Sequence, residues 1–126
     1  MNDRTRAFTR RVLSKTPENY PNQCQAGAYS AAFHYLKAVG QVGAAQAKAS
    51  GRGMVELMKR TPTDDDVFGP GRIREDGRKL HPVYLFEVKT PQESRGAWDY
   101  YKVAATTPGE EAFRPLAEGG CPLVRS

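Results

Sequence analysis

The stretch GPGRIREDGRKLHPVYLFEVK (Gly69–Lys89) decides how the rest of the chain is organised. Its Asp-Gly pair is a strong turn signal, because glycine accepts a positive φ angle and aspartate tolerates one. The pattern therefore predicts a β-hairpin with a short arm at Arg72–Arg74, a turn at Glu75–Gly77 and a longer apolar arm at Val83–Val88. Helical patterns precede this hairpin, and an aromatic strand follows it.

Three helices are predicted before the hairpin. The first runs from Asn2 to Lys15, with Asn2 or Asp3 as its N-cap. Pro17 ends it, because proline disfavours helical geometry in the residue before it. The second runs from Gln25 to Val39 and the third from Ala44 to Arg60.

The apolar residues of these helices predict their buried sides. In the second helix Phe33, Leu36 and Val39 recur at helical spacing and form one stripe. The third helix contains Ser50–Gly53, where each interior glycine costs ~1 kcal/mol relative to alanine, so we expect a break or a late start there. Its predicted buried side consists of Met54, Val55, Leu57 and Met58.

The remaining segments are short. Thr63–Phe68 is rich in aspartate and predicts a turn leading into the hairpin, Trp98–Thr107 predicts a strand, and Glu110–Phe113 a single helical turn. Three helices followed by a hairpin and a further strand would look α+β in an isolated chain. A small antiparallel sheet with one bare face needs a partner layer, so the chain is either a small domain or the end of something longer.

The composition is that of an ordinary globular chain of 126 residues, with 39% hydrophobic and 26% charged residues. No apolar run approaches the ~18 residues of a membrane span. No secretory signal follows Met1, so the chain as written would stay in the cytosol. The net charge of +5 is spread among acidic residues, without a groove-reading motif. We therefore expect no nucleic-acid partner.

The two cysteines, Cys24 and Cys121, lie far apart in the sequence and fit no metal-ligand spacing. We expect two separately buried thiols, although the sequence leaves a disulfide open. No metal site and no cofactor are predicted.

One set of residues permits an enzymatic interpretation. Asp76, followed by Glu87 and Lys89 on a predicted strand, matches the Asp…Glu-x-Lys pattern of metal-dependent nucleases, in which two carboxylates hold Mg²⁺ and the lysine steadies the attacking water. The alternative roles are a turn residue for Asp76 and exposed strand-end charges for Glu87 and Lys89. We favour the structural roles and predict that the protein is not an enzyme.

Other polar residues lack a catalytic context. His34 and His81 have no further ligand nearby, and we expect His34 to be a satisfied polar group on a helix face. Tyr29 stands near the start of the second helix among small residues, where free backbone N–H groups can face an anionic or zwitterionic ligand. A ligand contact and core packing both remain open for Tyr29.

The succession QAGAYSAAFHYLKAV, MKRTP, FGPGRIREDGRKLHPVYLFEVKTPQES and WDYYKVAATTPGEEAFRPLAEGGCPLV resembles the C-terminal part of the substrate-binding proteins of ABC transporters. The subgroup it resembles is the type I periplasmic binding proteins of the branched-chain amino-acid (Leu/Ile/Val-binding) class. The resemblance extends from Asn2 to Val124.

The resemblance implies an α/β fold in which two lobes close on a ligand. Residues 1–89 would complete the first lobe, and residues 90–126 would supply the hinge crossing, a strand and the tail of the second. It also implies a non-enzymatic protein of the periplasm that binds an amino acid or small carboxylate and is presented to a membrane permease. Tyr29 matches a family residue that lines the ligand site. In isolation, such a fragment would expose apolar surface and could self-associate.

Overall fold

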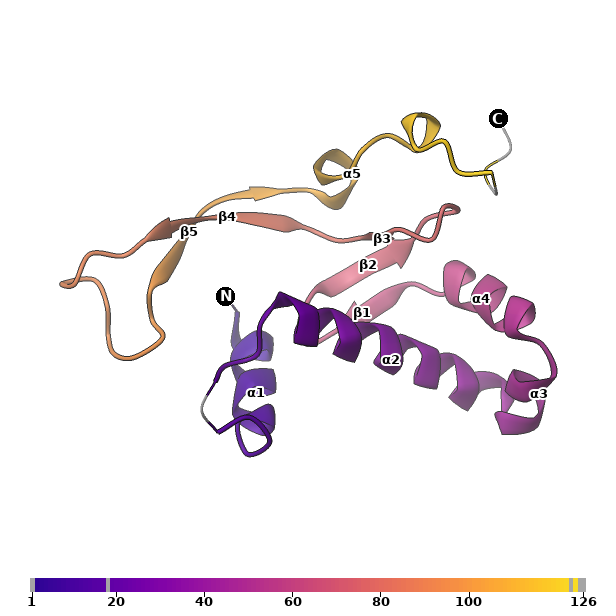
Figure 1. Cartoon of the computed structure of the whole chain (residues 1–126), viewed down its shortest axis with the longest axis horizontal. Helices are drawn as coiled ribbons and strands as arrows, with labels where there is room; N and C mark the ends of the chain where they lie inside the picture. The colour runs from indigo at the N-terminus through magenta and orange to yellow at the C-terminus, as the bar shows by residue number, and fades with distance from the viewer. Residues whose placement is uncertain (1, 18, 123, 125–126) are drawn as a thin grey trace.

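The computed structural model describes residues 2–17, 19–122 and 124 of the chain. Four helices come first: α1 (Asp3–Val12), α2 (Gln23–Val42), α3 (Ala44–Ala49) and α4 (Gly51–Arg60). They lie beside a small sheet, and a long two-stranded ribbon extends past them along one side of the molecule (Figure 1). The chain is thus a mixed helix and sheet structure whose helical part and ribbon are separate regions.

The helices begin where the sequence offers a side-chain cap. Asn2 accepts a hydrogen bond from the Thr5 N–H at 3.0 Å and caps α1, as predicted. Ser50 caps α4 in the same way, through the N–H of Gly53 at 3.0 Å. The predicted third helix is therefore broken at Ser50, because the glycines beside it weaken the helix and the serine hydroxyl starts a new one.

The first sheet has the strand order β1-β2-β3, with all pairs antiparallel. Its strands are β1 (Thr63–Asp65), β2 (Gly69–Ile73) and β3 (Lys79–Leu80). The prediction of a turn over Thr63–Phe68 is wrong for its first half, since β1 pairs with β2 there. The intrinsic strand propensity of aspartate is low, but tertiary hydrogen bonds override that propensity here.

The predicted Asp-Gly turn exists, but it joins shorter arms than expected. It links β2 to β3, and β3 is only two residues long. Pro82 follows β3 closely and has no N–H to donate to a ladder, so the pairing stops. The apolar arm β4 (Val83–Val88) pairs instead with β5 (Tyr101–Thr107) in a second sheet. The prediction that β4 belongs to the Asp-Gly hairpin is therefore wrong.

Gly71 allows β2 to lie close to both of its neighbours. A Cβ atom added at this position would lie 2.4 Å from the carbonyl oxygen of Leu80 and 3.0 Å from Oγ1 of Thr63. The hydroxyl of Thr63 is buried without a hydrogen-bond partner among the described residues. The centre of this sheet consequently tolerates only glycine at position 71.

The apolar core lies where α2, α3 and α4 meet. Ala38, Ala47 and Met54 are buried there, against the partly buried Val39, Val42, Leu57 and Met58. Two of the predicted core positions are wrong, because Leu36 is 62% exposed and Val55 is 50% exposed. These side chains lie on helix faces that no described element covers.

The end of the chain returns to the first sheet. After β5 come α5 (Gly109–Ala112), which confirms the helical turn expected nearby, and a 3-10 turn at Leu116–Glu118. The Arg72 guanidinium donates to both carboxylate oxygens of Glu110 at 2.8 and 2.9 Å. The rings of His81 and Phe113 lie 5.5 Å apart. These contacts attach the segment after β5 to β2 and to His81, directly after β3.

Both cysteines are free thiols, and the prediction that both are buried is wrong. Cys24 is exposed in the first turn of α2, and Cys121 is only partly buried. Residues 22–25, at the start of α2, are all exposed.

Candidate functional site

The surroundings of Tyr29 are aromatic. Its ring centroid lies 4.6 Å from that of Phe8 on α1 and 5.6 Å from that of Phe33 on α2, and the Tyr29 and Phe33 rings are stacked. Because α2 begins at Gln23, Tyr29 lies in its second turn, beyond the free N–H groups of the helix start. The helix-end argument for a ligand contact therefore does not apply. Tyr29 is half-buried, with its ring in the α1–α2 contact.

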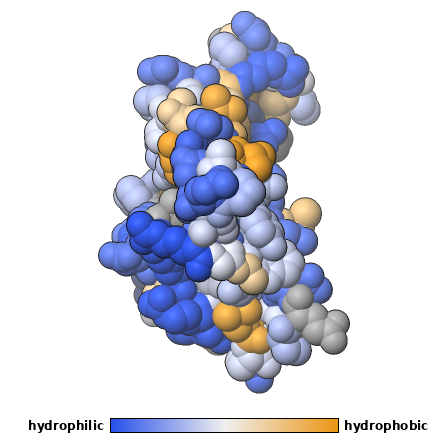
Figure 2. All heavy atoms as spheres, turned by 90° about the vertical axis from the view of Figure 1, so that its left-hand side faces the viewer, coloured by the Kyte–Doolittle hydropathy of each residue, from blue (hydrophilic) through white to orange (hydrophobic). Residues whose placement is uncertain are grey.

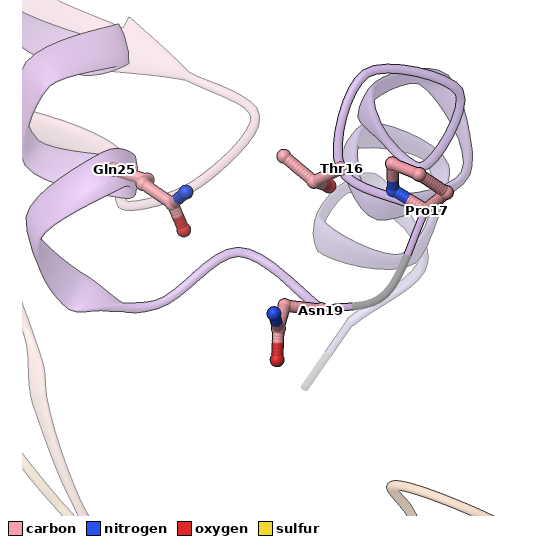
Figure 3. A pocket seen from close by; sticks show the side chains of 4 residues that line it. All are labelled: Thr16, Pro17, Asn19 and Gln25. Carbon is pink, nitrogen blue, oxygen red and sulfur yellow. The ribbon is translucent and has the colours of Figure 1, made fainter.

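A shallow hollow of about 330 Å³ lies close by, between the end of α1 and the start of α2. Thr16, Pro17, Asn19 and Gln25 line it, and the side chains of Thr16 and Gln25 face one another across it (Figure 3). Gln25 already accepts a hydrogen bond from the Asn22 N–H at 2.9 Å, as part of the capping box of α2. The described lining residues thus carry no charge, and part of their polar capacity maintains the helix start.

A buried polar network joins α2, β1 and β3. Ser30 donates its hydroxyl to Asp65 Oδ2 at 2.6 Å, and Lys79 Nζ lies 2.6 Å from both that oxygen and the Ser30 hydroxyl oxygen. The other oxygen of Asp65 accepts the backbone N–H groups of Val67 and Phe68 at 3.0 and 2.8 Å. Ser30 and Asp65 are each only 3% exposed. The Asp65 carboxylate thereby holds α2, β1 and β3 together and fixes the turn that follows β1.

The charge state of Asp65 follows from these contacts. Burial alone would raise its pKa, because it disfavours the charged form. Hydrogen bonds from Lys79, the Phe68 N–H and Ser30 outweigh burial and lower the pKa of Asp65 to about 2. The carboxylate is therefore ionised at neutral pH and pairs with the ammonium group of Lys79. The Asp65 carboxylate has no free lone pair directed at solvent, and its role is structural.

The residues of the nuclease pattern do not meet in the structure. Asp76 is held at the β2–β3 turn by Arg74, whose guanidinium donates to both of its oxygens at 3.0 and 2.7 Å. Glu87 pairs with Lys102 on the facing strand at 3.3 Å. Lys89 lies 2.7 Å from Asp99. The turn and the far end of the ribbon are at opposite ends of the molecule (Figure 1), so these three charges form no common site.

The histidines also have structural partners. His34 is buried, and its Nε2 lies 2.9 Å from the carbonyl oxygen of Met58, which ties α2 to α4. This is the satisfied helix-face histidine that the sequence predicted. His81 lies between the rings of Phe68 and Phe113. Within the described residues, no three His, Cys, Asp or Glu side chains gather to form a possible metal site.

The β4–β5 ribbon differs from the rest in having every residue of β4 exposed. Residues that face one another across the ladder share a side of the ribbon. One side, which we call the aromatic face, is almost entirely apolar, and the ring centroids of Phe86 and Tyr101 lie 6.1 Å apart on it. The opposite side carries the Glu87–Lys102 ion pair together with the exposed side chains of Val83 and Leu85. The aromatic face consists of Tyr84, Phe86, Val88, Tyr101 and Val103, with Thr106 opposite Tyr84 as its polar member.

The connection between the two strands carries the only tryptophan of the sequence. Trp98 adopts a φ of 68°, the left-handed region that costs a non-glycine residue roughly 1 kcal/mol. Its ring lies 5.1 Å from that of Tyr20 in the loop between α1 and α2. Seen from this end of the molecule, hydrophobic side chains reach the surface in patches between hydrophilic ones (Figure 2). No sequence signal indicated this contact.

The total accessible surface is large for the mass of the chain. It amounts to 9245 Å². A folded monomer of 13.9 kDa exposes about 6,700 Å². No described helix is long and apolar enough to cross a membrane. A helical layer beside a small sheet, with an uncovered ribbon, is the arrangement expected of one part of a larger α/β protein.

Comparison with known proteins identifies that class. The family model for periplasmic binding proteins matches residues 1–97, and the chain belongs to this family. The resemblance predicted from the sequence, and the α/β fold that it implied, are thereby confirmed. A search of curated proteins returned no match.

Two solved structures resemble almost the whole chain. A periplasmic binding protein from Burkholderia mallei is 38% identical, with a TM-score of 0.85. A branched-chain amino acid ABC transporter periplasmic ligand-binding protein from Burkholderia xenovorans is 41% identical, with a TM-score of 0.86. Each match covers 98% of this chain but only 32% of the other chain. The chain therefore spans about a third of the length of these relatives.

Proposed function

We propose that this chain is part of the solute-binding component of an ABC uptake transporter. The observation that carries the proposal is the 41% identity, over 98% of the chain, to the Burkholderia xenovorans ligand-binding protein. At that identity, the fold and the role as a binding protein rather than an enzyme are expected to be shared. The proposed ligand is an amino acid or a small carboxylate, the proposed partner is the membrane permease, and the proposed location is the periplasm.

The proposed mechanism is binding without covalent chemistry. Proteins of this type enclose a solute between lobes by hinge closure, and the closed form is the one presented to a partner. A crossing between lobes near Lys89–Pro91 is supported by its position directly after β4, every residue of which is exposed. The division into a first-lobe segment at residues 1–89 and a second-lobe segment at 90–126 remains a proposal. Contacts of Glu110 with Arg72 and of Phe113 with His81 join the two segments in this structure.

Tyr29 is our candidate ligand contact. Half-buried in the Phe8–Tyr29–Phe33 stack, it has a fixed ring position, and a tyrosine in that setting can direct its hydroxyl at a bound solute. The structure supports equally a purely packing role for the ring. The hydroxyl is the part that distinguishes the two, so a Tyr29→Phe substitution is the informative change.

The test uses calorimetric titration with leucine, isoleucine, valine and a set of aromatic acids. Two samples are compared: this chain, and a hybrid protein in which this chain replaces the matched third of the Burkholderia xenovorans protein. The hybrid protein is expected to bind at least one solute with a Kd in the micromolar range or below, and the chain by itself only weakly. A hybrid protein that melts cooperatively but binds none of these solutes would contradict the proposed ligand class.

A further inference from the structure

We propose that Tyr20 and Trp98 form an aromatic latch that fixes the direction of the β4–β5 ribbon relative to the helical part. The latch joins the loop between α1 and α2 to the connection between the two strands, residues 89–100. The inference rests on the proposed function, because it makes the latch a contact between the two proposed lobe segments. It adds the residues that set the angle between those segments.

The ribbon joins the rest of the chain at one end, which we call its root. β3 ends at Leu80 and β4 begins at Val83, while β5 ends at Thr107 and α5 begins at Gly109. The two connections are packed against each other, since a Cβ atom added at Gly109 would lie 2.9 Å from the backbone nitrogen of His81. A ribbon attached at its root alone would be free to swing as a unit, as hinged segments do.

The polar contacts of the ribbon stay within it. Its ion pairs, such as that of Glu87 with Lys102 at 3.3 Å, join residues of the ribbon to one another. Among the described residues, no hydrogen bond or ion pair joins residues 83–107 to the helices or to the first sheet. Within that part of the chain, the ring contact between Trp98 and Tyr20 is the only aromatic contact that does so. This contact is therefore the one that holds the far end of the ribbon.

The contact has the geometry of a favourable aromatic pair. The two ring centroids lie 5.1 Å apart and the ring planes are inclined by 60°, an edge-to-face arrangement that aromatic rings prefer. The connection bends away from the line of the strands toward α1, which brings Trp98 to the loop that carries Tyr20 (Figure 1). Both rings keep part of their surface in water, so the contact can open without disrupting a core.

The backbone of the connection holds Trp98 in place. Its φ of 68° is a conformation that persists in a non-glycine residue only where surrounding contacts impose it. The carboxylate of the next residue, Asp99, accepts hydrogen bonds from Lys89 Nζ at 2.7 Å and from the Arg95 N–H at 3.0 Å. The Asp99 N–H donates to the carbonyl oxygen of Gly96 at 3.2 Å. The connection is therefore a fixed support for the Trp98 ring.

A latch of this kind biases the direction of the ribbon. A contact that forms at one direction and is absent at others shifts the equilibrium toward the direction at which it forms. Tyr20 lies in residues 1–89 and Trp98 in residues 90–126, so under the proposed function that direction is the angle between the two lobe segments. The latch favours the angle seen here and opens when the segments move apart.

The experiment measures the direction of the ribbon in this chain by the distance between two nitroxide labels. Double electron–electron resonance gives the distribution of that distance. The labels are attached at Gln92→Cys and Lys48→Cys, two exposed positions in the connection and in α3, which lie at opposite ends of the molecule (Figure 1). Cys24→Ser and Cys121→Ser remove the natural thiols. A single narrow distribution is expected, and a distribution that is broad before any latch residue is changed would overturn the proposal.

Four variants test the latch itself. Tyr20→Ala is expected to widen the distribution at least twofold, because it removes one ring of the latch. Trp98→Gly should widen it by the same amount, since glycine keeps the positive φ and removes only the ring. Changing both residues together should widen it no further, because the two rings act through one contact. Tyr20→Phe, which retains the ring, should leave the width unchanged.

Tyr84→Ala is the matched control. Tyr84 is a ribbon residue of similar exposure whose ring contacts that of Phe86 within the ribbon, so the width should not change. Equal widening by Tyr84→Ala and Tyr20→Ala would indicate a general loosening of the ribbon and reject the latch, as would no widening by Tyr20→Ala. Circular dichroism separates a moved ribbon from an unfolded chain. A Tyr20→Ala chain that loses its helices would also contradict the proposal, because the latch lies outside the core.

The label distances are measured without solute, so this inference and the proposed function can fail independently. A hybrid protein that binds no solute in calorimetry contradicts the proposed function and leaves the label distances as evidence for the latch. Label distances that do not respond to Tyr20→Ala reject the latch and leave the solute binding of the hybrid protein as measured.

Discussion

Similar residues are buried in the helical part of the molecule but exposed in the β4–β5 ribbon. In the helical part and the β1-β2-β3 sheet beside it, Met54 is 4% exposed against Ala38 and Ala47, and Asp65 is buried in its ion pair with the partly buried Lys79. In the ribbon, Phe86 is 45% exposed and the Glu87–Lys102 pair faces water. Residue type alone does not separate the two regions, whereas the presence of a covering element does.

The difference indicates where this chain derives its own stability. Contacts that are already buried contribute to folding of the chain by itself, whereas exposed apolar residues contribute only once something covers them. The helical part is therefore expected to respond to substitution in the isolated chain, and the ribbon only in an assembled protein. Four predictions follow this contrast, from the largest expected effect to the smallest.

The largest effect is expected at the buried carboxylate. Asp65→Asn should lower the free energy of unfolding by about 4 kcal/mol, because it leaves Lys79 partly buried without its counter-charge. The control is Asp64→Asn at the adjacent residue, which pairs with Arg4 at the surface and should change stability by about 0.5 kcal/mol or less. Urea unfolding followed by circular dichroism measures both. Equal losses would show that burial does not distinguish the two pairs.

The next effect compares one apolar residue from each region. Met54→Ala should cost about 3 kcal/mol in both the isolated chain and the hybrid protein, because it opens a cavity among α2, α3 and α4. Phe86→Ala should cost about 0.5 kcal/mol or less in the isolated chain, where the ring is half-exposed. In the hybrid protein it should cost about 3 kcal/mol. A large loss in the isolated chain would mean that the ribbon is already packed there.

The same contrast explains how much of the fold could be predicted from the sequence. Caps and breaks are local, so Asn2 and the break at Ser50 were predicted correctly from neighbouring residues. The exposure of Leu36 and Val55 could not be predicted, because it depends on which elements lie nearby. Helical periodicity shows that a face is apolar but not that this chain covers it.

The pairing of the strands was the second feature that the sequence could not predict. The Asp-Gly turn is a local signal and is present, but the choice of partner for β4 depends on a strand that begins more than ten residues later. The β1 strand was missed because its aspartates argued against it, while the hydrogen bonds that Asp65 accepts from Ser30 and Lys79 come from distant elements. For the candidate site, sequence resemblance indicated Tyr29, and the aromatic stack around it became visible only in three dimensions.

The third prediction concerns acid pH. The pKa of Asp65 is lowered to about 2 in the folded chain, below its ordinary value of 3.8. A lowered folded pKa stabilises the protein above the ordinary value, and that stabilisation is lost as the pH falls toward 2. It amounts to roughly 2 kcal/mol. Between pH 5 and pH 2, the free energy of unfolding should therefore fall by that much less in Asp65→Asn than in the natural sequence.

Glu93 on the ribbon connection provides the control for this measurement. Its hydrogen bond from Lys102 also lowers its pKa to about 2, but both side chains face solvent. Water and salt screen such a pair. Glu93→Gln should therefore leave the fall in the free energy of unfolding between pH 5 and pH 2 nearly unchanged. If Glu93→Gln flattened the decline as much as Asp65→Asn, the ribbon would contribute to stability as the helical part does.

The smallest effect is expected at Tyr29, and it is measured in binding. If its hydroxyl contacts the solute, Tyr29→Phe should weaken binding by the hybrid protein about fivefold to tenfold, which is roughly 1 kcal/mol for one lost hydrogen bond. Stability should stay within about 0.5 kcal/mol, because phenylalanine keeps the stack with Phe8 and Phe33. Tyr35→Phe, at an exposed position of the same helix, is the control and should change neither quantity.

The two possible results of the Tyr29→Phe substitution distinguish a ligand contact from a purely packing role for this residue. Weaker binding at unchanged stability would show that a ring buried by this chain presents its polar end to a surface completed by another segment. Unchanged binding would place Tyr29 wholly among the residues that hold α1 against α2, as its ring contacts do. In that case the solute-contacting residues of this chain must be sought among side chains that are exposed here, since only those can meet a ligand once the remaining part of the fold is in place.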